Sequence, residues 1–81
     1  MEPTAELTFG GKMAGVSFNP SGDERVAKIK GLFANIIDEL AGPSGENMGK
    51  VTGLQSPLLD VAVSHAITAQ MWAVKAITFK D

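Results

Sequence analysis

The sequence predicts a mainly α-helical protein: an antiparallel helical hairpin with a short N-terminal extended or β segment, assembling into a compact homo-oligomer. Two long segments carry apolar residues at helical spacing, and a stretch rich in glycine separates them. The chain has only 81 residues and no cysteine, yet 44% of its residues are apolar. A chain this short buries too little surface to be comfortably stable alone, and oligomerisation is a usual remedy. We therefore expect several copies to associate.

The N-terminal segment, residues 5–18, reads "AELTFGGKMAGVSF". Two short alternating pieces flank Gly10 and Gly11, and a Gly-Gly pair suits the tight turn of a β-hairpin. A lone two-stranded hairpin is barely stable in water, so it would lean on helices or remain a flexible arm. We interpret residues 1–15 as an N-terminal arm or β-hairpin and residues 16–81 as a helical-hairpin domain.

The first helix is predicted to begin within "NPSGDE" and to end near Ala41, because Gly42 and Pro43 follow. Ser21 and Glu24 have the spacing of a capping box, in which the hydroxyl and the carboxylate each satisfy a free backbone amide. The apolar residues of this segment form one continuous arc at helical spacing: Val26, Ile29, Leu32, Phe33, Ile36, Ile37 and Leu40.

The second helix is predicted to follow a loop over residues 42–53, with Ser56 as its cap, Pro57 at its first position and its end near Phe79. A helix that is apolar around most of its circumference must be buried on most sides, which one partner helix cannot do. Five alanines in this helix step by three and four and form a seam that permits close approach by another helix: Ala62, Ala66, Ala69, Ala73 and Ala76.

Charge and composition argue against several classes of partner. The net charge is −2 and no run of basic residues occurs, whereas binding to a DNA or RNA duplex normally requires a basic patch. The first residues, "MEPTAELTFGG", lack the pattern of a signal peptide. No apolar run approaches the ~20 residues of a membrane span. We therefore expect a soluble, intracellular protein that binds neither nucleic-acid duplexes nor membranes.

Catalytic chemistry is poorly represented. His65 is the only histidine, and no cysteine can pair with it. Ser64 is adjacent in sequence, but helix neighbours one residue apart point in different directions, so no catalytic triad is indicated. No cluster of side chains has the spacing of metal ligands. We therefore predict no catalytic residues, no metal and no cofactor, and interpret His65 as a packed interface residue.

Lys30 and Phe18 are the main candidates for ligand contacts. Lys30 lies at the margin of the apolar arc, where its stem can lie on apolar surface with the ammonium in water, or its charge can face a phosphate bound between subunits. Phe18, just before the helix, can pack onto that helix or stack on a base. Both alternatives remain open from sequence alone.

Five polar residues complete the candidate binding set. Arg25, Lys28 and Lys75 are interpreted either as solvated charges or as contacts to an anion. Asn19 and Ser21 lie at the start of the first helix, where they can offer polar contacts to a ligand.

Two segments, "FNPSGDERVAKIKGLFANIIDEL" and "AITAQMWAVKAITF", resemble the helical-hairpin domain shared by the phage anti-CBASS and anti-Thoeris cyclic-nucleotide sponges. The resemblance covers roughly residues 16–79. It implies a compact hexamer in the bacterial host cytoplasm that sequesters cyclic di- or trinucleotides, or glycocyclic ADP-ribose, without cleaving them. In relatives, an aromatic residue ahead of the first helix and the lysine of the "IK" pair contribute to nucleotide binding; these look like Phe18 and Lys30.

The chain also departs from its apparent relatives. They often use a tyrosine or more arginines, whereas Arg25 is the one arginine here. The alternative interpretation is a non-catalytic helical module for oligomerisation or protein interaction, in which the lysines only keep the assembly in solution.

Overall fold

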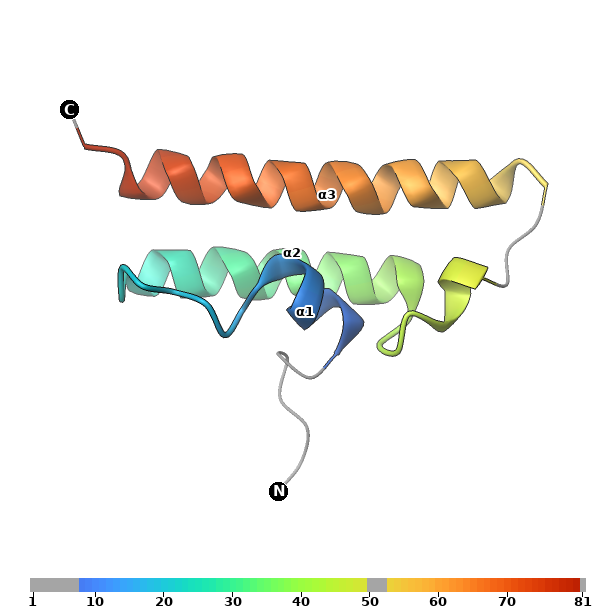
Figure 1. The fold of residues 1–81 in the computed structure, drawn as a ribbon, viewed down its shortest axis with the longest axis horizontal. Helices are drawn as coiled ribbons and strands as arrows, with labels where there is room; N and C mark the ends of the chain where they lie inside the picture. The colour runs from blue at the N-terminus through green and yellow to red at the C-terminus, as the bar shows by residue number, and fades with distance from the viewer. Residues whose placement is uncertain (1–7, 50–52, 81) are drawn as a thin grey trace, which may run out of the picture.

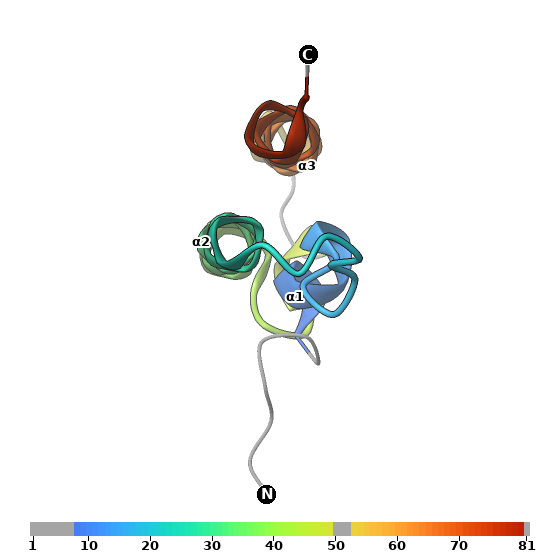
Figure 2. The same ribbon diagram turned by 90° about the vertical axis from the view of Figure 1, so that its left-hand side faces the viewer.

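The computed structural model describes residues 8–49 and 53–80, which contain helices and no strand. Figures 1 and 2 show α2 and α3 side by side and running in opposite directions, with α1 beside α2 and α3 lying over both. The predicted mainly helical class is therefore confirmed. The elements, in order, are α1 (Phe9–Ala14), α2 (Glu24–Ala41), the 3₁₀ helix η2 (Glu46–Gly49) and α3 (Gln55–Thr78).

The predicted β-hairpin around Gly10 and Gly11 is wrong, because these residues belong to helix α1. The Thr8 hydroxyl accepts a hydrogen bond from the Gly11 amide at 3.0 Å, and the Asp38 carboxylate accepts one from the Gly10 amide at 2.6 Å. Gly10 also lies directly on α2, since an added Cβ would be 2.1 Å from the Ala34 carbonyl oxygen. Tertiary contacts thus override the weak helix propensity of glycine. Residues 5–7 of the predicted hairpin lie outside the described residues.

Helix α2 ends at Ala41, as predicted, and Gly42 at its C-cap has a φ of 89°. Its N-cap, however, is Asp23 and not Ser21. The Asp23 carboxylate accepts a hydrogen bond from the Arg25 amide at 2.8 Å, while Ser21 accepts one from the Asp23 amide at 3.1 Å within the preceding turn. The carboxylate lies closer to the helix than the hydroxyl and takes the free amide of the first turn.

The capping carboxylate makes the stability of α2 sensitive to acid. Hydrogen bonding from the Arg25 side chain, then from its backbone, lowers the pKa of Asp23 below its usual value. A lowered pKa in the folded state means that the stabilisation is present above the ordinary aspartate pKa of about 3.9 and is lost as pH falls through the folded value. We expect wild type to lose more thermal stability between about pH 5 and about pH 3 than Asp23→Asn; equal losses would contradict this.

Helix α3 begins at Gln55 after Leu54, and no side chain caps it, so the predicted Ser56 cap is wrong. Pro57 still lies in the first turn, where its missing amide hydrogen leaves no hydrogen bond unmade. The helix ends at Thr78, close to the predicted end.

The core is small and lies between α2 and α3. Ile37 and Ala41 of α2 pack with Val63 of α3 at its centre. Within α3, only Val63 and Gln70 are buried. Partly buried apolar side chains surround this cluster: Phe9, Leu40, Met48, Leu59, Ala66 and Ile67. The side of α3 that faces away from α2 is therefore uncovered in a single copy.

Candidate functional site

A pocket of about 200 Å³ lies between the turn that precedes α2 and the last turns of α3. Four of the seven predicted site residues line it, and they are Phe18, Asn19, Ser21 and Lys30. The remaining lining residues are mainly apolar: Pro20, Val26, Val74 and Thr78. The structure thus gathers the central predicted candidates around one small, largely apolar pocket.

Lys30 neither extends into solvent nor projects a free ammonium. It is buried, with 6% of its surface exposed. Its Nζ donates hydrogen bonds to the Gly15 carbonyl at 3.2 Å and to the Phe18 carbonyl. Both acceptors belong to the segment that joins α1 to α2, so Lys30 ties this segment to the side of α2.

Phe18 is held with its ring exposed to solvent rather than packed in the core. Its side chain is 68% exposed, and its ring centroid lies 5.3 Å from the Lys30 Nζ, within cation–π range. Lys30 therefore fixes both the backbone and the ring of Phe18. The exposed part of the ring is accessible to a planar group.

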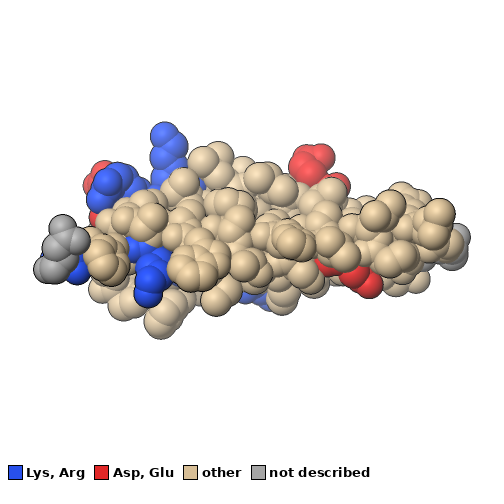
Figure 3. Space-filling model, turned by 90° about the horizontal axis from the view of Figure 1, so that it is seen from above, with Lys and Arg blue, Asp and Glu red and all other residues tan. Residues whose placement is uncertain are grey.

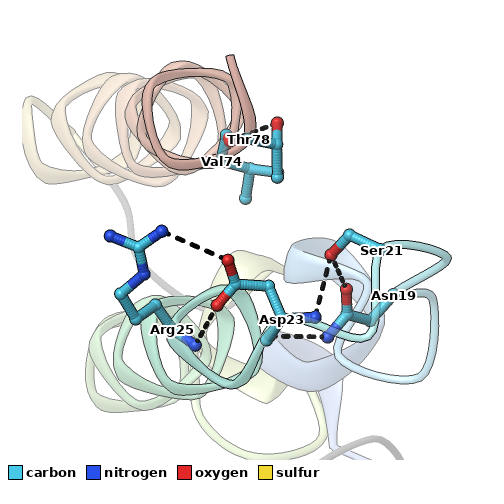
Figure 4. Close-up of polar contacts among 6 residues, drawn as sticks. All are labelled: Asn19, Ser21, Asp23, Arg25, Val74 and Thr78. Atoms are coloured by element: carbon cyan, nitrogen blue, oxygen red, sulfur yellow. Dashed lines mark hydrogen bonds and ion pairs between the residues drawn. The ribbon is translucent and has the colours of Figure 1, made fainter. Parts of the chain in front are cut away.

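Asn19 and Ser21 are joined in a hydrogen-bonded turn ahead of α2 (Figure 4). Ser21 donates to the Asn19 side-chain oxygen at 2.7 Å, and the Asn19 amide donates to the Asp23 carbonyl at 3.1 Å. Gly22, with a φ of 69°, makes this tight turn possible. The polar groups of Asn19 and Ser21 therefore shape the pocket wall.

A second, more polar hollow of about 350 Å³ adjoins the first, and the two share Ser21 and Thr78. Its lining includes Arg25 and Lys80 together with Asp23. Arg25 forms an ion pair with Asp23 at 3.2 Å, but its side chain remains 71% exposed (Figure 4). With two cations against one acid, this second hollow suits an anionic group.

Lys80 was missed by sequence reasoning. It follows the end of α3, and only the antiparallel arrangement of α2 and α3 brings it beside Arg25. A sequence signal did exist, since a predicted hairpin places the end of the second helix at the start of the first.

Lys28 and Lys75 are exposed and line neither hollow. They lie toward the same end of the molecule, where Figure 3 shows most of the visible Lys and Arg atoms. They contribute positive charge near the site without direct contact to either hollow.

Among residues 8–49 and 53–80, no group of three or more His, Asp or Glu side chains is placed to hold a metal ion. His65, expected to be packed at an interface, is exposed on α3 in a single copy. None of the helices described is long and apolar enough to cross a membrane. No protein-family model, curated protein or solved structure matches this chain.

Proposed function

We propose that this protein binds cyclic nucleotide immune messengers in the cytoplasm of a bacterial host and sequesters them as a homo-oligomer, without degrading them. One observation carries the proposal. A buried lysine holds an exposed aromatic ring, that of Phe18, at a small apolar pocket beside a cationic hollow. The ligand class is a cyclic di- or trinucleotide or glycocyclic ADP-ribose.

The two neighbouring hollows match the two parts of a nucleotide. A base stacks on the exposed face of Phe18, a contact worth about 1–3 kcal/mol per base. A phosphate accepts charge-assisted hydrogen bonds from Arg25 and Lys80 in the adjoining hollow. Because Lys30 already orders the segment that carries Phe18, little ordering remains to be done on binding, which favours high affinity.

Self-assembly is supported by the apolar surface that one copy leaves uncovered. Leu58, Met71 and Trp72 of α3 are each more than 60% exposed, and Leu32 and Ile36 of α2 are about half exposed. Burying each such side chain between copies would contribute about 1.5–3 kcal/mol at full burial. A hexamer, as in the family that the sequence resembles, is the assembly that we propose.

Calorimetric titration tests the binding proposal. The panel comprises 3′,3′-cyclic di-AMP, a cyclic trinucleotide and a glycocyclic ADP-ribose isomer. Phe18→Ala is expected to weaken binding of the tightest member by roughly 10- to 100-fold through lost stacking. Met13→Ala, which removes a half-exposed side chain of α1 outside both hollows, is the control and should bind as wild type does. No binding of any panel member would overturn the proposal.

The second candidate function is a helical oligomerisation module with no small ligand. The exposed apolar side of α3 favours it, because such a surface needs a partner whatever the pocket does. A stable oligomer that binds no member of the titration panel would select this candidate over the first.

A further inference from the structure

We propose that a second copy of this chain packs antiparallel on the outward side of α3. Five large apolar residues lie along that side at helical spacing: Leu54, Leu58, Val61, Trp72 and Phe79. Each is at least half exposed, with values from 52% to 84%. We call these five residues the α3 stripe. The stripe is opposite the buried Val63 and Gln70, which face the rest of the chain.

The α3 stripe extends from one end of the helix to the other. The 24 residues of α3 correspond to a length of about 36 Å at 1.5 Å per residue. Figure 3, which looks onto the α3 side, shows an uncharged surface along the middle of the molecule. His65 and the small Ala69 and Ala76 fill the remaining positions of this side, all exposed. Small residues of this kind allow a second helix to approach closely.

The distribution of charge along the molecule selects a second copy in the antiparallel orientation. Arg25, Lys28 and Lys80 lie toward the end where α2 begins, whereas Asp38 and Glu39 lie near the end of α2. Figure 3 shows this separation, with blue gathered toward one end and red toward the other apart from acids at the start of α2. Antiparallel packing brings unlike ends together, while parallel packing would place like ends side by side.

This arrangement leaves the pocket open. Val74 and Thr78, which line the pocket, project from the side of α3 opposite the stripe. Two antiparallel copies would therefore carry their pockets at opposite ends of the pair, each with its Phe18 uncovered by the α3–α3 contact. The inference rests on the self-assembly part of the proposed function. It identifies α3 as the helix through which two copies contact each other.

Cysteine crosslinking tests the arrangement on the full chain, because wild type has no cysteine. About the stripe midpoint, two copies of His65 are offset by about 4.5 Å along the axis, and two copies of Leu58 by about 25 Å. A bismaleimide linker that spans about 10 Å should therefore join His65→Cys to itself and leave Leu58→Cys unjoined. A mixture of Val61→Cys and Trp72→Cys should give the mixed dimer, since these positions face each other. Asn35→Cys, exposed on α2, is the control for collisional crosslinking.

Salt dependence supplies a second readout that does not depend on cysteine. Raising the salt concentration should raise the dimer dissociation constant several-fold in sedimentation velocity, because salt screens the attraction between the unlike ends of two antiparallel copies. Crosslinking of Leu58→Cys as efficient as that of His65→Cys would overturn the antiparallel arrangement. So would a lack of crosslinking both for His65→Cys and for the mixture of Val61→Cys and Trp72→Cys. If the chain still binds a cyclic dinucleotide in calorimetry in that case, the binding proposal stands and only this inference fails.

Discussion

A Lys30→Met variant is expected to lose both stability and ligand binding. Methionine preserves the apolar stem but leaves the Gly15 and Phe18 carbonyls without their buried donor. Loss of two hydrogen bonds from a charged, buried donor to partly buried carbonyls costs about 2–4 kcal/mol in the free energy of unfolding. The segment that carries Phe18 would loosen, so binding of 3′,3′-cyclic di-AMP or another panel ligand should fall as well. Urea unfolding and calorimetry measure the two effects.

The stability measurement distinguishes two roles for Lys30. A lysine that only contacted a bound phosphate would change binding and leave the unfolding of the free protein unchanged. Lys28→Met is the matched control, because Lys28 is exposed on the same helix and should stay within about 0.5 kcal/mol of wild type. A Lys30→Met protein as stable as Lys28→Met would contradict the structural role assigned to Lys30.

Gly10→Ala is expected to detach α1 from α2. The new Cβ would lie 2.1 Å from the Ala34 carbonyl oxygen and 2.7 Å from the Asp38 carboxylate, distances that no side-chain rotation can relieve because one of these atoms is backbone. The hydrogen bond from the Gly10 amide to Asp38 should be lost in the displacement. Overpacking together with this loss amounts to about 3 kcal/mol of destabilisation, measurable by urea unfolding.

Gly31→Ala is the matched control for that experiment. Gly31 lies within helix α2, and apart from its chain neighbours and the adjoining helix backbone no atom lies within 4 Å of the position that its Cβ would occupy. The same glycine-to-alanine change should therefore stabilise the protein by about 0.5–1 kcal/mol through helix propensity. A Gly10→Ala variant that behaves like Gly31→Ala would show that α1 does not pack closely on α2.

Elements determined by local signals were predictable. Helix α2 ends at Ala41 because Gly42 and Pro43 follow, and that signal lies within three residues. Helix α1 was not predictable in this way, because its glycines suggest a turn. What stabilises α1 is remote in sequence: the Asp38 carboxylate holds its first turn, and Gly10 fits against α2 only because it has no side chain.

The candidate site shows the same difference between residues found by local sequence signals and residues placed by contacts remote in sequence. Phe18, Asn19 and Ser21 were found together because they are nearly consecutive. The role of Lys30 was not foreseen, since its partners are backbone carbonyls, which leave no trace in residue type. Lys80 enters the site only through the pairing of α3 with α2.

Recovery of intact ligand tests the central claim most directly. The protein is mixed in molar excess with the tightest-binding member of the titration panel, the free ligand is separated by ultrafiltration, and the retained fraction is released by denaturation and identified by mass spectrometry. The proposed sequestration predicts that nearly all ligand is retained and then recovered chemically unchanged after prolonged incubation. Ligand left free in the filtrate, or recovered as a hydrolysed product, would contradict it.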